Sequence, residues 1–263
     1  MRTLAVIPAR LGATRLPRKP MRLLAGLPLV VRVWERVTTM DLFDKVIVAT
    51  DSAEVEGAVV ARGGEVARTL EHNSGTERAA YAASLPAYAG RYDVVVNVQG
   101  DEPFVSRRAL VGATQMITEL GYEIGTAAVP APPSVLGDPN VVKVVTTARG
   151  QAMYFSRAPI PFLRDALDAE LQRSQIYQHL GIYAYTIGTL LNWKNIPETP
   201  LEQIERLEQL RPLAAGIPIG VALIDEPVRP GIDTEADLER ANREWPVHGE
   251  TPTVGAKRRR EEQ

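Results

Sequence analysis

The cations of one short segment have the type and spacing to bind an anion. The segment RLGATRLPRKP, residues 10–20, directly follows the apolar run LAVIPA and contains Arg10, Arg15, Arg18 and Lys19. At an effective dielectric constant near 20, two like charges about 4 Å apart repel by about 4 kcal/mol, so a bound anion would stabilise such a cluster. Gly12 allows the backbone to approach a ligand closely. From these residues alone, a phosphate site and a loop whose cations spread into water are equally good interpretations.

Two aspartates stand at positions that suit ligands of magnesium. Asp101 follows a buried-strand pattern in VVVNVQGDEP, beside Gly100, which leaves room for a ligand. A carboxylate at a strand end can hold Mg²⁺ on a nucleotide phosphate, but an Asp before Glu-Pro also commonly forms a turn. Asp233 in GIDTEADLER could be a second ligand of Mg²⁺, although Asp233 or Thr234 also suits the N-cap of a helix. Both alternatives stay open at this stage.

Other kinds of catalytic site have little support. The sequence has no cysteine and three histidines, of which His72 and His179 lie far apart, so neither a serine triad nor a His-rich metal site is favoured. No Walker A motif and no G-x-G-x-x-G motif occurs. Arg157 in MYFSRAPIP is placed to act as a fixed cation for an acidic substrate. His179 comes just before a strand that contains Tyr183, where core packing and ligand contact are both open.

Composition sets limits on the partners. The 263 residues carry a formal net charge of −2, with 45% hydrophobic and 24% charged residues, which is typical of a soluble globular protein. The cations are therefore a local feature and not part of a surface that binds nucleic acid. The N-terminus does not fit a signal peptide, and no stretch reaches the roughly 18 apolar residues of a membrane span. We expect a cytoplasmic protein with no membrane partner.

The elements that must position these residues alternate between strand and helix. Apolar runs rich in Val and Ile, typical of strands buried on both faces, occur at residues 4–7, 46–49, 94–98, 141–145 and 221–224. Apolar residues at helical spacing predict helices around residues 29–37, 55–60 and 110–120, and one helix over 200–216. This order predicts an α/β fold with a mostly parallel sheet that binds ligands at the carboxyl edge of its strands.

The chain is predicted to form a single domain over residues 1–245. The alternation loosens over about 131–190, where prolines and turn residues are frequent, and this range is interpreted as an inserted lobe. Residues 246–263 have few apolar side chains and opposed blocks of charge, which predicts a disordered tail.

Nine segments, taken in order, resemble the 3-deoxy-manno-octulosonate (Kdo) cytidylyltransferase family, also called CMP-Kdo synthetases. They are IPARLGATRLPRKP, VIVATD, HNSGTERAA, VNVQGDEPF, DPNVVKVV, YFSRAPIP, HLGIYAY, PLEQIERLEQLR and PGIDTEADLER. The resemblance implies a Rossmann-like sheet of the nucleotide-diphospho-sugar transferase type, an inserted lobe for sugar binding and dimerisation, and a homodimer. It also implies transfer of CMP from CTP to the anomeric hydroxyl of Kdo, giving CMP-Kdo and pyrophosphate for lipopolysaccharide biosynthesis.

The resemblance further implies roles for single residues. The catalytic residues would be Arg10, Arg15, Lys19, Asp101 and Asp233, and the last two would bind Mg²⁺. The CTP-binding residues would be Pro8, Ala9, Arg10, Arg15, Lys19, Ser74, Gly75, Arg78 and Gln99. The residues around the sugar acid would be Gln99, Arg157, His179, Tyr183, Glu208 and Gln209.

Three positions depart from the family pattern. Ala13 stands where the family has serine, Arg18 where it has glycine, and Thr186 where arginine is common. Two alternatives to the Kdo enzyme follow: a cytidylyltransferase for another acidic sugar, such as a nonulosonic acid, and a nucleotide-binding module without catalysis.

Overall fold

The computed structural model describes residues 1–12 and 15–245. Ala13 and the tail predicted for residues 246–263 lie outside the described residues. The strands are β1 (Thr3–Ala9), β2 (Leu23–Leu24), β3 (Leu27–Pro28), β4 (Lys45–Thr50), β5 (Glu65–Arg68), β6 (Val94–Asn97), β7 (Ile124–Pro130), β8 (Lys143–Thr146), β9 (Ala152–Ser156), β10 (Tyr177–Thr186) and β11 (Ile219–Leu223).

The helices alternate with these strands. The α-helices are α1 (Leu29–Thr39), α2 (Ala53–Val60), α3 (Gly75–Ser84), α4 (Arg107–Thr118), α5 (Ala169–Arg173), α6 (Ile187–Leu191), α7 (Pro200–Glu205), α8 (Leu210–Ala214) and α9 (Glu235–Glu244). Short 3-10 helices are η1 (Lys19–Met21), η2 (Pro133–Gly137), η3 (Ala166–Asp168) and η4 (Trp193–Asn195). Among the described residues, no helix is both long and apolar enough to cross a membrane.

The central sheet confirms the predicted α/β class. Its strands follow the order β11-β7-β10-β6-β1-β4-β5. The pairs β1–β4, β1–β6, β4–β5 and β7–β11 are parallel, whereas β10 runs antiparallel to both β6 and β7. The carboxyl ends of β1, β4 and β6 therefore meet at one edge, where ligands bind in such sheets.

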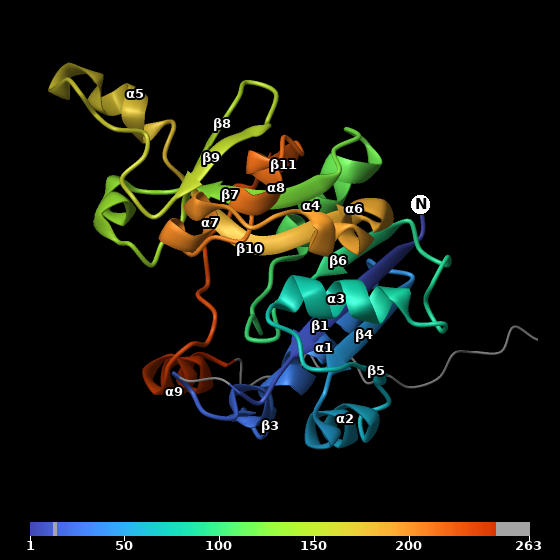
Figure 1. Cartoon of the computed structure of the whole chain (residues 1–263). Helices are drawn as coiled ribbons and strands as arrows, with labels where there is room; N and C mark the ends of the chain where they lie inside the picture. The colour runs from blue at the N-terminus through green and yellow to red at the C-terminus, as the bar shows by residue number, and fades with distance from the viewer. Residues whose placement is uncertain (13–14, 246–263) are drawn as a thin grey trace, which may run out of the picture.

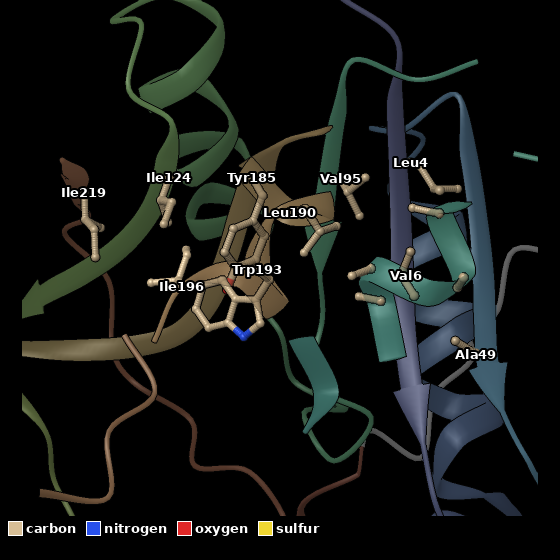
Figure 2. Close-up of a cluster of buried hydrophobic side chains, with 14 of the residues drawn as sticks. Leu4, Val6, Ala49, Val95, Ile124, Tyr185, Leu190, Trp193, Ile196 and Ile219 are labelled. Carbon is tan, nitrogen blue, oxygen red and sulfur yellow. The ribbon is translucent and has the colours of Figure 1, made fainter. Parts of the chain in front are cut away.

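The core has two layers because β1 and β6 are buried on both faces. On one face, Leu4 and Val95 pack with Tyr185 and Trp193, as Figure 2 shows, under α3, α6 and η4. On the other face, alternate residues of the same strands, such as Ala5, pack against α1, α2 and α4. Figure 1 shows this arrangement of helices around the sheet. Continuous apolar runs predicted these strands for that reason.

The single helix predicted over residues 200–216 is wrong. The chain forms α7 and α8, which are separated at Arg206, a residue with a left-handed φ of 54°. The side chain of Arg157 explains the break, because its Nε donates to the carbonyl of Glu205 at 2.8 Å, at the last residue of α7. After the interruption, the carboxylate of Glu208 faces α3 and accepts hydrogen bonds from the hydroxyls of Ser74 and Thr76.

Residues 131–190 include two kinds of structure. β10 lies inside the central sheet, while β8 and β9 form an antiparallel pair joined to it through the β8–β10 contact. α5 lies at the end of an arm that extends away from the sheet (Figure 1). The inserted lobe within the single domain stays a prediction.

The C-terminal helix α9 returns to the start of the chain. Thr234 is its N-cap and forms a capping box with Asp237, so the N-cap interpretation holds for Thr234 and leaves Asp233 free of that role. Leu238 packs with Leu16 and Leu24 in a small separate cluster. The helix therefore places Asp233 beside the cationic segment, which lies more than 200 positions earlier.

Candidate active site

A cavity of about 320 Å³ opens at the carboxyl edge of the sheet. Its wall comes from the end of β1 and the following segment, from the start of α3, from the residues after β6 and from Asp233. The predicted CTP-binding residues all line it: Pro8, Ala9, Arg10, Arg15, Lys19, Ser74, Gly75, Arg78 and Gln99. The structure thus brings together one predicted set from three distant segments, residues 8–19, 74–78 and 99.

Lys19 joins the two aspartates. Its ammonium donates to Asp101 Oδ2 at 2.6 Å and to Asp233 Oδ1 at 2.7 Å. Burial alone would lower the pKa of Lys19, but the charges and hydrogen bonds of Asp101 and Asp233 outweigh burial and raise it. Arg15 lies 3.6 Å from Asp233 with a mostly exposed side chain. Each of the catalytic residues predicted from the resemblance, except Arg10, is therefore paired with at least one other member of the set.

The same two carboxylates fit the predicted magnesium ion. Both have an oxygen within 2.7 Å of one ammonium, so they converge on the position of a single cation. Within residues 1–12 and 15–245, no cluster of three or more His, Cys, Asp or Glu side chains could hold a metal. Mg²⁺ is commonly bound by one or two carboxylates together with water and substrate phosphates, so a pair is enough. The donor set fits Mg²⁺ and does not form a closed protein cage.

A third carboxyl group, that of Glu102, lies behind the pair. Burial, with the nearby charges of Asp101 and Asp233, raises the pKa of Glu102 to about 8. Sequence reasoning did not single out Glu102, because its burial depends on tertiary packing.

The N-terminus of α3 forms another wall of the cavity. Ser74 caps the helix by accepting from the backbone N–H of Glu77, and its hydroxyl donates to Glu208 Oε1 at 2.8 Å. A Cβ on Gly75 would lie 3.2 Å from Pro8 Cγ, so the glycine permits close approach to β1. A helix N-terminus attracts phosphate groups through its N–H donors and its dipole.

The guanidinium of Arg78 is held by Thr69 and Asp51, which do not line the cavity. Its Nη1 donates to Thr69 Oγ1 at 2.5 Å and its Nη2 to Asp51 Oδ2 at 3.0 Å. The residue is buried, yet it contributes to the cavity wall. We infer that Arg78 fixes the start of α3 and supplies positive charge at the wall.

Arg18 points away from the cavity. It has φ of 57°, in the left-handed region that favours glycine, and its guanidinium pairs with Glu54 of α2 at 2.5 Å. Arg18 is absent from the cavity wall. Thr186 also has a local role, because it caps α6 by accepting from the N–H of Thr189.

A larger cleft of about 1500 Å³ lies on the other side of Asp233 and shares Arg15 with the first cavity. Arg157 and His179 line it. Burial lowers the pKa of His179 to about 3, so the ring is neutral, and its Nε2 lies 2.9 Å from Thr126 Oγ1. Neighbouring rings of Phe155 and Tyr183 hold it in place.

The remaining predicted sugar-acid residues do not line this cleft. Tyr183 stacks on Tyr185 with ring centroids 5.9 Å apart, and Gln209 is buried. Glu208 accepts from Ser74 and from Thr76 Oγ1 at 2.9 Å. Gln99 lines the smaller cavity only. The structure therefore separates the predicted sugar-acid set: Arg157 and His179 line the cleft, Gln99 lines the smaller cavity, and the other three residues line neither.

Sequence reasoning assigned no role at the site to His72. His72 lines the cavity, and its buried Nε2 has no hydrogen-bond partner within the part of the chain that the structure describes. Burial, with the charge of Arg78, lowers the pKa of His72. Its place directly before NSGTER was a usable signal, because that motif was already assigned to the nucleotide.

Known proteins match the chain over nearly its full length. A family model described as cytidylyltransferase matches residues 4–219. A 3-deoxy-manno-octulosonate cytidylyltransferase from Gemmatimonas aurantiaca is 54% identical over 248 residues, covering 94% of this chain and 95% of the relative. One from Xanthomonas campestris pv. campestris is 43% identical over 245 residues, covering 90% and 97%. The chain belongs to the cytidylyltransferase family.

Solved structures support the same assignment. The structure of CMP:2-keto-3-deoxy-manno-octonic acid synthetase complexed with CTP matches with a TM-score of 0.84 and 37% identity, covering 92% of this chain and 98% of that one. A 4-diphosphocytidyl-2C-methyl-D-erythritol synthase from Anaerococcus prevotii, at 12% identity and a TM-score of 0.59, shares the fold. The mostly parallel sheet of this cytidylyltransferase is thus the one expected for the family.

Proposed function

We propose that this cytidylyltransferase transfers CMP from CTP to the anomeric hydroxyl of Kdo and releases pyrophosphate. The observation that carries the proposal is the junction formed by Lys19, Asp101 and Asp233. It lies between a cavity lined by phosphate-binding residue types and a larger cleft, and Asp233 belongs to both. A nucleotide on one side and a sugar acid on the other would meet at these three side chains.

The smaller cavity would hold the nucleotide. Arg10, Arg15 and Lys19 supply positive charge for the triphosphate, and Ser74 and Gly75 present the N-terminus of α3. Lys19 begins η1, Ser74 is the N-cap of α3 and Gly75 begins that helix, so regular structure orients these groups before the ligand arrives. Such preorganised charge stabilises a transition state more effectively than water does.

The reaction needs orientation and neutralisation of charge. The anomeric hydroxyl of the sugar loses its proton to water as its oxygen forms a bond to the α-phosphorus of CTP, and the bond from that phosphorus to the bridging oxygen of pyrophosphate breaks. Arg15 and Lys19 stabilise the charge that develops on the departing pyrophosphate. Asp101 and Asp233 would hold Mg²⁺, which when bound supplies further charge neutralisation at the reacting phosphates.

The cleft would hold the sugar acid. Arg157 provides a cation beside the neutral ring of His179, a combination suited to a carboxylate and hydroxyl groups. A nonulosonic acid has the same groups, so it is the second candidate substrate.

Pyrophosphate release tests the proposal. The full chain with CTP and Mg²⁺ is offered Kdo, a nonulosonic acid or no sugar, and release is expected with Kdo. Release with the nonulosonic acid alone would assign the second candidate substrate. CTP binding in calorimetry without release from either acid would assign the non-catalytic module. Excess EDTA is expected to stop release, and added Mg²⁺ to restore it; release unaffected by EDTA would refute the metal role of the two aspartates.

We also propose that the protein is a homodimer that assembles through its arm. Phe162, Leu167 and Leu171 are exposed there by 82%, 91% and 65%, and a hollow of about 360 Å³ lies beside Phe162 and Leu171. Exposed apolar groups gathered in one place commonly mark an interaction surface. Sedimentation should give a dimer for the wild type and a monomer for Phe162→Ser with Leu171→Ser. A monomeric wild type would refute the homodimer, and a double variant that stays dimeric would refute the arm as its interface.

The cytoplasmic location of the protein stays a prediction.

A further inference from the structure

Lys143 is a fully buried lysine that the proposed reaction does not use. It lies on β8, and its side-chain nitrogen donates to three backbone carbonyls. The acceptors are Val141 at 2.8 Å, Asp138 at 3.0 Å and Arg157 at 2.5 Å. A lysine ammonium has three N–H donors, so each donor of Lys143 has a carbonyl.

Burying a lysine ammonium costs free energy, and a need to fill space does not explain why a lysine stands here. Transfer of an ammonium out of water is unfavourable unless all its donors are satisfied, and burial lowers the pKa of Lys143. An apolar side chain of similar length would fill the same space without that cost. The distinctive property of Lys143 is therefore that it ties residues 138–141 to the end of β9.

Both tied segments form the wall of the large cleft. Asp138, Pro139 and Val141 line it, as does Arg157. The guanidinium of Arg157 also depends on this segment, because its Nη1 donates to the carbonyl of Pro139 at 2.8 Å. Lys143 thus holds the carbonyl of Arg157 directly and holds the segment that orients its guanidinium.

Arg157 also forms hydrogen bonds toward α7. Its backbone N–H donates to Glu205 Oε2 at 2.9 Å, and its Nε donates to the carbonyl of Glu205 at 2.8 Å. These bonds fix Arg157 toward α7. Lys143 fixes it from the opposite side, toward the sheet.

We infer that Lys143 is a positioning residue for the sugar-acid half of the site, which it shapes by locking residues 138–141 and Arg157 in one geometry. The inference rests on the proposed function of the cleft. Among the described residues, the hydrogen bonds of the Lys143 ammonium all go to backbone carbonyls outside the lining of the nucleotide cavity, so we expect its effect to be confined to the sugar acid. A misplacement of about 1 Å in a substrate-positioning group can cost about 10²-fold in rate.

The test compares Lys143→Met with the matched control Val144→Ala in the full chain. Val144 is the next residue of β8 and is also fully buried, but it packs in the apolar core. Initial rates of pyrophosphate release give KM for CTP and for Kdo. Lys143→Met is expected to raise KM for Kdo at least about 10-fold and to leave KM for CTP within about 3-fold. Val144→Ala is expected to lower thermal stability and leave both constants near the wild type.

Hydrogen exchange gives a second measurement that does not depend on activity. The amide hydrogens of residues 138 and 140–142 should exchange faster in Lys143→Met than in Val144→Ala, because the carbonyls of their segment lose a common donor. If Lys143→Met does not fold, Lys143→Gln, which keeps two donors, takes its place with a smaller expected effect in the same direction.

The outcomes separate this inference from the proposed function. A folded variant whose KM for Kdo stays within 3-fold of the wild type, or whose KM for CTP rises equally, overturns the role of Lys143. If the wild type uses another sugar acid, the Kdo proposal fails and the same KM comparison is made with that acid. If no acid is used, unchanged exchange at residues 138–142 overturns the tie itself.

Discussion

Replacing Lys19 by methionine removes an ammonium that donates to both Asp101 and Asp233. The substitution keeps the length of the side chain and deletes its charge, so the remaining carboxylates of Asp101 and Asp233 face each other. At an effective dielectric constant near 20, two unit charges about 4 Å apart repel by about 4 kcal/mol. Asp101 and Asp233 have side chains 30% and 49% exposed, so solvent screens part of that repulsion.

The catalytic loss follows from the same geometry. Without its ammonium, the site loses a preorganised positive charge where pyrophosphate departs, and one such contact is typically worth about 10² to 10³ in rate, or about 3 to 4 kcal/mol. We therefore expect Lys19→Met to lower kcat for pyrophosphate release at least about 10²-fold, and Asp101→Asn to do the same. Both rates are measured at saturating CTP and Kdo.

A matched variant separates catalysis from general electrostatics. Lys45 forms an ion pair with Glu65 between β4 and β5, and it lines neither cavity. Lys45→Met removes the same charge and should keep kcat near the wild type. The reasoning fails if folded Lys19→Met, judged by circular dichroism and thermal melting, retains more than a tenth of the wild-type turnover.

Three further predictions come from single contacts. Arg18→Gly should leave KM for CTP within about 3-fold and should not lower the melting temperature. Glycine removes a left-handed backbone strain of about 1 kcal/mol, which offsets the loss of an exposed ion pair that contributes about 0–1 kcal/mol. A 10-fold rise in KM for CTP would show that Arg18 binds phosphate. Gly100→Ala should reduce CTP affinity in calorimetry, because its Cβ would lie 2.7 Å from the carbonyl oxygen of Pro8, whereas Gly12→Ala meets nothing within 4 Å and should bind normally; equal affinities would contradict this account. Buried His179, with a pKa of about 3, should make the protein lose stability as pH falls below about 6.5, because the unfolded chain then takes up a proton that the folded chain does not. The free energy of unfolding should fall by up to about 1.4 kcal/mol per pH unit from this residue. In denaturant titrations, His179→Gln should show a smaller dependence of that free energy on pH, and an unchanged dependence would assign it to another group.

Sequence patterns predicted the strands whose residues are buried on both faces. β1, β4 and β6 have continuous apolar runs because α-helices cover both sides of the sheet there. β7 was missed, although it is equally buried, because its sequence IGTAAVP contains small residues. Gly125 explains this composition: a Cβ would lie 2.0 Å from the carbonyl oxygen of Ala113, so α4 packs directly on the backbone of β7. Close packing of helix and strand removes the very side chains that a strand pattern depends on.

The order of the strands could not be predicted from local patterns. β10 is placed between β6 and β7 and runs against both, and its position depends on contacts between residues such as Tyr183 and Asn97 that lie far apart in sequence. The partner of the Arg18 side chain could not be predicted from local patterns either. Its charge suggested phosphate binding, but its partner on α2 becomes visible only once the chain is folded.

The cationic segment is completed by a part of the chain beyond the matched family region. Asp233 lies outside residues 4–219, yet its neighbour Ile232 donates its backbone N–H to the carbonyl of Asp101 at 2.9 Å. Ile232 is also buried against Leu16, which follows Arg15 in the cationic segment. The two aspartates are therefore tied by backbone and by packing, independently of Lys19. The backbone positions of Asp101 and Asp233 can stay close when the ammonium turns toward a phosphate, because this hydrogen bond and this packing do not involve Lys19.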